Sequence, residues 1–588
     1  MSAHQLITEN LDLWTQAVTK KSTAGRGRSG KTELTGIKKL RELILELAVR
    51  GKLVEQDPDD EPASRLLERI AESRKALIAE NRIKNSKPLP SVSPDEFPSA
   101  LPFGWVWTRL GSIAEINPRN AGDDSLEVSF IPMPLVTTSY HGEHGDEPRN
   151  WGEIKKSYSH FANGDVGLAK ITPCFENSKA AVFRNLRNGI GAGTTELHVA
   201  RPLSSAVNPY FLLLFLKSPR FLSAGEKVMT GSAGQKRVPK DYFSETPLPL
   251  PPEQKQHRIV QKVDELMALC DRLEQHTSDQ LDAHATLVDT LLGTLTQFAN
   301  ATELADNWAC LAEHFDTLFT TEQSIDKLKQ TILQLAVMGR LVKKDAGDES
   351  ATDFLTQIHT RKVELANKKI IKRPRELTLL KDSEHSYIAP SHWTWTSFQD
   401  VADEISTGPF GSMIHKHDYV EGGIPLINPS HMFKGHIKED LSVSVSLAKA
   451  EELSSYRLAN GDIVMARRGE VGRCAAVTDR EAGWLCGTGS FVLKFHPAVN
   501  RQFILLLFST DTVRNYLTGN SVGTTMTNLN HGILKKMPVA VPPAKEQHRI
   551  VQKVDELMAI CDQLKERLNQ ASDTRCQLAG AVVEQAIN

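Results

Sequence analysis

Two segments of the chain carry apolar residues at the spacing of a helix that packs against a partner. In each segment, five apolar side chains follow one another at intervals of four, three, four and three residues, as in a heptad seam. The first set is Ile259, Val263, Leu266, Cys270 and Leu273, and the second is Ile550, Val554, Leu557, Cys561 and Leu564. Proline pairs at 251–252 and 542–543 precede them, and proline suits a helix start because its φ angle is already helical. The pattern predicts two long helices.

The two predicted helices are near copies of each other. Residues 256–271 and 547–562 agree at 15 of 16 positions, 291 residues apart. A short apolar stripe is typical of a helix buried on its own domain, which is one interpretation. Two nearly identical stripes can instead pack on each other about a pseudo-two-fold axis. We expect the second arrangement, an antiparallel coiled coil within the chain.

The duplication extends upstream of these helices. Residues 39–54 (KLRELILELAVRGKLV) match residues 327–342 (KLKQTILQLAVMGRLV) at 10 of 16 positions, 288 residues apart. A tryptophan pair follows each block, Trp105 and Trp107 in the first copy and Trp393 and Trp395 in the second. The repeated unit is therefore a helix, a middle domain and a second helix.

The two middle segments are predicted to contain β-strands. They hold short β-rich runs broken by Gly, Pro and Asn, such as GDVGLAKI in the first and GDIVMARR in the second. Outside a few such landmarks the two segments diverge widely. A constant scaffold that holds two domains of one fold with different surfaces indicates that the surfaces carry the function.

Composition excludes several classes of protein. The 70 Lys and Arg residues nearly balance the 72 Asp and Glu residues, so any contact with nucleic acid must be local. The seven cysteines form no CxxC pair, which predicts reduced thiols and no metal site. The chain has no run of about 18 apolar residues, so we expect a cytoplasmic protein that does not bind a membrane.

Several segments together resemble one known family. These are residues 249–271 (PLPPEQKQHRIVQKVDELMALCD) and their second copy, the two upstream helices, the tryptophan pairs, and residues 407–431 (TGPFGSMIHKHDYVEGGIPLINPSH). In this order they resemble Type I restriction enzyme specificity subunits. The resemblance covers the chain from about residue 36 onward.

The resemblance implies an α+β fold. Two mixed α/β target recognition domains are expected, joined by duplicated long helices that form the antiparallel coiled coil. The expected divisions are an N-terminal helix and basic linker (1–35), a first conserved helical region (36–98), recognition domain 1 (99–247), a central conserved helical region (248–385), recognition domain 2 (386–540) and a C-terminal conserved helix (541–588).

The resemblance also implies a function without catalysis. Such a chain reads a split, asymmetric site in double-stranded DNA and positions two methyltransferase subunits and the restriction subunits, which translocate and cleave DNA. No cofactor is expected in this chain. S-adenosylmethionine, ATP and Mg are expected in the partner subunits.

Candidate reading residues lie in loops of both middle domains. Readout needs side chains that reach base edges, with basic residues nearby to contact phosphates. The first domain offers Thr137, Thr138, Tyr140, Lys170, Ser232, Gln235, Lys236 and Arg237, and the second offers Asn428, Ser430, His431, Arg467, Arg468, Thr524, Thr525 and Asn528. Lys170, Arg467 and Arg468 follow predicted strands and are assigned to phosphate. For any one of these residues, a solvated loop is the alternative.

A single-chain DNA methyltransferase or restriction enzyme is the alternative class. Residues 25–32 (GRGRSGKT) match a phosphate-binding loop, but no apolar strand precedes them. Residues 208–211 (NPYF) are similar to the NPPY-type loop of adenine methyltransferases but lack its second proline. We therefore interpret these segments as a basic linker and a helix start, and we expect no catalytic residues.

Overall fold

The computed structural model describes residues 3–20, 32–84, 89–96, 100–232, 234–296, 308–309, 311–410, 413–519 and 529–587. The chain forms two compact units, one of Met1–Gln280 with Gln570–Asn588 and the other of Leu281–Asn569. The boundaries fall inside the two longest helices, α10 (Glu253–Leu295) and α20 (Ala544–Ile587). Each unit therefore contains the start of one long helix and the end of the other. Among the described residues, no helix combines the length and apolar character that crossing a membrane requires.

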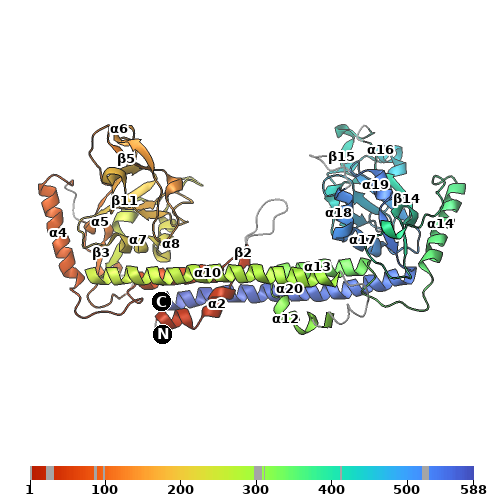
Figure 1. Ribbon diagram of the computed structural model, residues 1–588. Coiled ribbons are helices and arrows are strands. Elements are labelled where there is room, and N and C mark those ends of the chain that lie inside the picture. The colour runs from red at the N-terminus through yellow and green to blue at the C-terminus, as the bar shows by residue number, and fades with distance from the viewer. Residues whose placement is uncertain are drawn as a thin grey trace. The chain divides into compact units, whose positions relative to one another are not determined.

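The first unit consists of a helical base and a β-rich domain (Figure 1). Its helices are α1 (Ala3–Thr8), α2 (Leu11–Gln16), α3 (Thr35–Val49), α4 (Ala63–Ala79), α5 (Leu110–Ile113), α6 (Trp151–Ile154), α7 (Pro209–Lys217), α8 (Pro219–Val228), α9 (Lys240–Glu245) and the start of α10. Its strands are β1 (Thr19–Lys20), β2 (Thr32–Glu33), β3 (Val106–Arg109), β4 (Ala114–Ile116), β5 (Glu127–Ile131), β6 (Glu147–Asn150), β7 (Ser159–Ala162), β8 (Val166–Ala169), β9 (Ala180–Val182), β10 (Ile190–Gly193), β11 (Leu197–Pro202) and β12 (Pro247–Leu250). The domain holds two four-stranded sheets, ordered β6-β5-β10-β7 and β4-β11-β8-β9.

The second unit repeats this plan. Its helices are α12 (Phe315–Leu318), α13 (Glu322–Val337), α14 (Ala351–Asn367), α15 (Phe398–Val401), α16 (Leu447–Glu452), α17 (Arg501–Ser509), α18 (Asp511–Gly519), α19 (His531–Lys535) and the start of α20. Its strands are β13 (Thr394–Ser397), β14 (Ala402–Thr407), β15 (Tyr419–Ile427), β16 (Met432–Phe433), β17 (His436–Ile437), β18 (Ser444–Val445), β19 (Ile463–Ala466), β20 (Cys474–Ala476), β21 (Leu485–Cys486), β22 (Ser490–Phe495) and β23 (Pro538–Val541). Its sheet β14-β22-β19-β20 has the same order as β4-β11-β8-β9. The expected α+β fold with two repeated mixed α/β domains is confirmed.

Each β-rich domain is closed at its base by its own first and last strands. The entry strand β3 pairs antiparallel with the exit strand β12, and β13 pairs with β23 in the same way. The exit strand leads directly into the long helix, and the tryptophan just before the entry strand packs against the glycine at the end of the upstream helix. The base of each domain is therefore fixed by both of its chain connections.

The heptad seams are buried, but their partner differs from the expected one. Ile259 and Val263 lie in a hydrophobic cluster with Leu40 of α3, and Ile550 packs in a second cluster with Leu328 of α13. We expected the two seams to pack on each other, and this expectation is corrected. The upstream helices carry an apolar face of their own, which covers the seam within the same unit. The end of the other long helix packs on each seam as well, so the expected association of the two long helices stands and only the pairing of seam with seam is corrected.

The individual seam positions share this environment. Buried in one of the two clusters are Ile259, Val263, Cys270, Ile550, Val554 and Cys561, while Leu266, Leu273, Leu557 and Leu564 are partly buried against them. The end of the other long helix completes each cluster, with Val583 in the first and Leu292 in the second. Both long helices therefore contribute to both clusters.

Two features of the structure require glycine at the end of each upstream helix, namely its backbone conformation and its contact with a tryptophan. Gly51 and Gly339 have φ angles of 69° and 72°, in the left-handed region that ends helices. A Cβ atom at either glycine would also lie 2.7 Å from the ring of Trp105 or Trp393. The duplicated helix and the duplicated tryptophan are thus in contact, which explains why both recur together.

Replacing Ile550 with Ala should destabilise the second unit by about 2–5 kcal/mol, because Ile550 is fully buried and its truncation leaves a cavity. The measurement is the free energy of unfolding of this unit in urea. Ile560 on the same helix is 54% exposed, so Ile560→Ala should change that value by less than about 0.5 kcal/mol. Equal effects of the two substitutions would contradict the packing described above.

Candidate nucleic-acid interface

The first candidate site lies where strand β8 ends beside the segment that enters α9. The Val238 N–H donates to the carbonyl oxygen of Lys170 (2.8 Å), and the Thr172 N–H donates to that of Lys236 (3.0 Å). On the other side of Lys170, its own N–H donates to the Glu196 carbonyl (2.9 Å). Residues far apart in sequence are thereby held on one rigid backbone frame.

The second unit contains the same backbone frame. The Leu529 N–H donates to the Arg467 carbonyl (2.8 Å), and the Arg467 N–H donates to the Gly489 carbonyl (3.0 Å). Arg467 therefore occupies the place of Lys170, and Gly489 that of Glu196. The predicted residues Thr524, Thr525 and Asn528 lie outside the described residues.

The predicted residues of the first frame lie together. Ser232, Gln235 and Lys236 are exposed, whereas Lys170 and Arg237 are half-buried. Arg237 forms a bidentate ion pair with Glu196, a residue that the sequence reasoning missed.

The predicted loop at residues 137–140 has a different environment. The Thr137 hydroxyl donates to the Glu143 carbonyl (2.8 Å), and the Thr138 carbonyl accepts from the buried Lys217 ammonium (3.4 Å). Tyr140 packs against the helical cluster of α3 and α10, where burial raises its pKa to about 12. The structure therefore gives Tyr140 a packing contact, so its side chain is less available for base reading.

The residues predicted after β15 differ in their exposure to solvent. Asn428 caps the short 3-10 helix Pro429–His431, which contains Ser430 and His431. His431 is buried, and its Nδ1 accepts a hydrogen bond from the Asn428 N–H (3.3 Å). Burial also lowers the His431 pKa, so the ring favours the neutral form. Ser430 is exposed, and among these three it is the side chain with the freest access to solvent.

Arg467 and Arg468 differ in their surroundings. The Arg467 guanidinium lies 5.4 Å from the ring centre of Phe491, and its Nε has no hydrogen-bond partner among the described residues. Desolvation and the neighbouring Arg468 lower its pKa. Arg468 is exposed. The pair thus combines a stacked, half-buried arginine with a solvated one.

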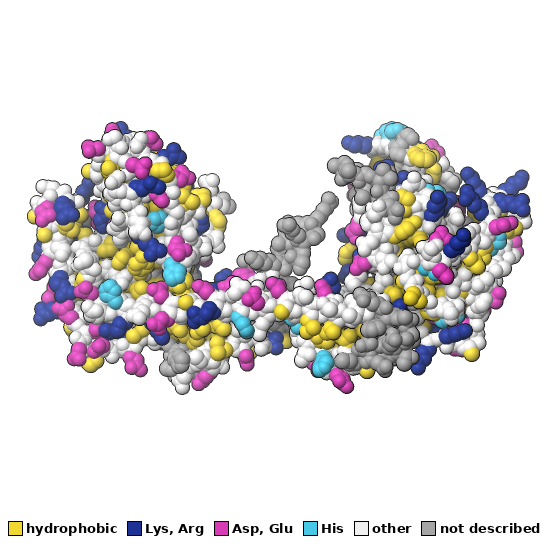
Figure 2. Space-filling view, in the orientation of Figure 1, with side chains coloured by type: hydrophobic (Ala, Val, Ile, Leu, Met, Phe, Trp, Pro, Cys, Tyr) yellow, Lys and Arg dark blue, Asp and Glu magenta, His cyan; other side chains and the backbone are white. Residues whose placement is uncertain are grey.

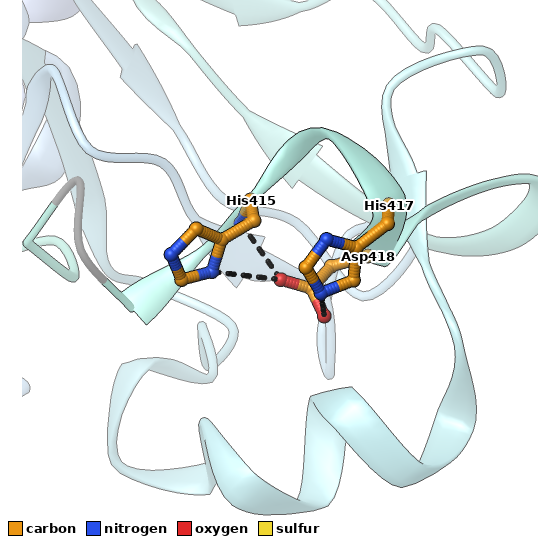
Figure 3. Close-up of side chains that lie close together, drawn as sticks. All are labelled: His415, His417 and Asp418. Carbon is orange, nitrogen blue, oxygen red and sulfur yellow. Dashed lines mark hydrogen bonds and ion pairs between the residues drawn. The ribbon is translucent and has the colours of Figure 1, made fainter.

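One group of side chains has the composition of a metal site, which the sequence did not predict. His415, His417 and Asp418 lie close together around the 3-10 helix Lys416–Asp418 (Figure 3). The Asp418 carboxylate accepts a hydrogen bond from the His415 N–H (2.7 Å) and lies 3.8 Å from the Lys449 ammonium. The hydrogen bond to this N–H, with smaller contributions from nearby cations, lowers the Asp418 pKa. Capping of the short helix accounts for this arrangement without a metal ion.

The NPYF segment begins a helix, as the sequence predicted. The Asn208 side chain accepts from the Tyr210 N–H at the start of α7 (2.9 Å), and Asn500 accepts from the Gln502 N–H at the start of α17 (2.9 Å). The asparagine side chains therefore serve as helix caps in both units. Of the GRGRSGKT segment, only Thr32 lies within the described residues.

Two domains of one fold, with equivalent strand-end frames and different polar side chains on them, define a protein that presents two distinct recognition surfaces. A family model described as "Type I restriction modification DNA specificity domain" matches residues 104–283 and 390–571. The chain belongs to this family. It is a specificity subunit, the component without catalytic activity that recognises the DNA sequence, and a single-chain enzyme is not supported.

Two full-length relatives agree with this assignment, and the chain is also similar to a solved structure. The chain is 46% identical to the Type I restriction enzyme EcoAI specificity subunit and 43% identical to the EcoEI specificity subunit, both from Escherichia coli, over 100% of each chain. A solved HsdS subunit from Thermoanaerobacter tengcongensis is 17% identical, with a TM-score of 0.44 over 84% of this chain and 98% of that one.

The stability of the first unit should depend on pH through Lys217. Burial lowers the pKa of this lysine from 10.5 to about 7, so between these values the unfolded chain binds more protons than the folded chain. Stability should therefore rise as the pH increases from 7 toward 10. Lys217→Met should flatten this dependence of the thermal midpoint, while Lys227→Met, at an exposed site, should leave it unchanged. A wild-type midpoint that falls over this range, relative to Lys217→Met, would contradict the burial of the ammonium.

Proposed function

We propose that the chain reads a bipartite, asymmetric DNA site, with one half read by each unit. The observation that carries this proposal is the repeated frame with unequal side chains. Lys170 and Glu196 of the first unit have Arg467 and Gly489 as their counterparts. The frame holds Lys170 and Arg467 at equivalent places, whereas different side chains favour different bases. An asymmetric site follows because the two surfaces are not alike.

We also propose that this chain positions two methyltransferase subunits together with restriction subunits in the cytoplasm. S-adenosylmethionine, ATP and Mg would be bound by those partners. Apolar side chains exposed on the long helices support such docking, since Leu287, Ile560 and Leu578 are each at least half exposed. The balanced surface charge also supports it, because partners can then supply much of the contact with phosphates. Figure 2 shows Lys and Arg side chains interspersed with Asp and Glu over the visible face.

Gln235→Ala should alter base preference in one half of the site and leave the other half unchanged. Gln235 is exposed on the first frame, and glutamine can make two hydrogen bonds to adenine. A lost base contact should reduce discrimination at one base pair by about 1–3 kcal/mol. The measurement is methylation by the assembled complex of a library with single substitutions at every position of the site. Equal relaxation in both halves would contradict separate reading.

Lys170→Ala should weaken binding to all sequences alike, because a phosphate contact carries no sequence information. The slope of log affinity against log salt concentration should decrease in magnitude by about 0.9, as expected for one lost phosphate contact. Lys155, half-buried like Lys170, is ion-paired with Asp124 elsewhere in the same unit, so Lys155→Ala is a matched control that should leave the slope unchanged. If Lys170→Ala instead alters the preference at one base pair, Lys170 contacts a base.

A further inference from the structure

The Arg237 side chain is held in one orientation by an acidic partner. Its Nε donates to Glu196 Oε2 (2.8 Å) and its Nη2 donates to Glu196 Oε1 (2.9 Å), in a side-on bidentate pair. The Arg237 backbone is also fixed, because its N–H and carbonyl both bond to Thr230 (2.8 and 3.0 Å). The Glu196 carboxylate stays ionised at neutral pH since hydrogen bonds from Arg237 lower its pKa.

The donors of Arg237 that remain without a described partner point to a use outside the chain. A guanidinium has five N–H donors. Two bond to Glu196, and Nη1 donates a third to the Gln235 carbonyl (3.2 Å). Within the described part of the chain, one N–H on Nη1 and one on Nη2 are left. Two parallel donors on the terminal nitrogens match the O6 and N7 acceptors of guanine in the major groove.

Stability alone does not explain this ion pair. The Arg237 side chain is 43% exposed, and ion pairs at exposed sites contribute little to the free energy of unfolding. The negative charge also offsets a positive charge on a surface that meets phosphates. Glu196 reduces the general attraction of this surface to DNA, but it fixes the direction of the Arg237 side chain. Its effect is therefore to favour discrimination between bases over affinity for DNA.

We propose that Glu196 is a positioning residue that directs Arg237 toward a guanine in the first half of the DNA site. This inference rests on the proposed reading function of the first frame and names the base and the residue that sets it. Arg237 makes the contact, and Glu196 acts through it. The second unit lacks this device, since glycine occupies the position of Glu196.

The experiment measures methylation by the whole complex on DNA with each base of the site substituted in turn. Arg237→Ala should reduce discrimination at one G·C pair of the first half by roughly 5- to 150-fold. Arg237→Lys should lose the same discrimination, because lysine keeps the charge but not the two parallel donors. Glu196→Gln should lower discrimination at that same base pair to a smaller extent. The thermal midpoint of each variant shows whether it is folded.

A double variant separates positioning from an independent contact. If Glu196 acts only through Arg237, adding Glu196→Gln to Arg237→Ala should cause no further loss at that base pair. Glu127→Gln is the control, because it removes another exposed arginine partner, that of Arg187, in the same unit. It should leave the discrimination unchanged.

Three results would overturn the inference. Glu196→Gln with unaltered preference, or with an altered preference at a different base pair, would show that Glu196 does not direct Arg237. Additive losses in the double variant would show that Glu196 contacts DNA by itself. An Arg237→Ala variant with unchanged preference at every position would overturn both this inference and the reading role proposed for Arg237. If Gln235→Ala still altered base preference in one half of the site, the proposed function would stand.

Discussion

The structure depends on the burial of one face of each long helix against the helix that precedes its recognition domain. The exit strand of a domain leads directly into the long helix, and the tryptophan before its entry strand packs against the end of the upstream helix, so the domain is fixed at its base. The first turn of each long helix also bonds to the recognition domain. Gln256 accepts from the Asn208 N–H (2.7 Å), and Gln547 accepts from the Asn500 N–H (3.0 Å). These glutamines are almost fully buried, where an unsatisfied amide would be costly. The long helices thus hold the starts of α7 and α17 in the two recognition domains, which ties the duplicated base to the fold that the two domains share.

One position in this junction differs in charge between the units. Lys255 is fully buried and donates to the Val54 carbonyl (2.8 Å), whereas the equivalent Glu546 is fully buried and accepts from the Trp393 indole (3.0 Å). A buried charge is tolerated only where its own partners satisfy it. Each long helix therefore fits the upstream segment of its own unit, and exchanging the two would leave a carboxylate facing carbonyl oxygens. The duplicated halves are alike in fold but not interchangeable at this point.

The sequence predicted the repeated elements well because they depend on local pattern. Heptad spacing identified the buried face of both long helices, although Leu266, Leu273, Leu557 and Leu564 are only partly buried. The turn before β8 and β19 placed Lys170 and Arg467 at equivalent points. The partner of the seam was wrong, because periodicity shows which face is buried and not what covers it. Tyr140 and His431 were chosen as polar residues in loops, and tertiary packing partly buries the Tyr140 ring against the helices and buries the His431 ring in its own turn. Their role in base reading stays a prediction. Glu196 was missed since 41 residues separate it from Arg237, and only the pairing of β11 with β8 brings it to the loop.

The Glu196–Arg237 pair also relates the charge of this chain to two separate tasks, non-specific contact with phosphates and the reading of bases. Non-specific DNA affinity comes from unpaired cations near phosphates, whereas base reading comes from directed hydrogen bonds. A net charge of −2 over 588 residues gives this chain little general attraction to DNA. On the first frame the carboxylate of Glu196 neutralises Arg237, which leaves Lys170 and Lys236 as its cations. A chain of this kind gains by binding DNA together with partners that supply the phosphate contacts, because its own side chains can then be devoted to distinguishing one base pair from another.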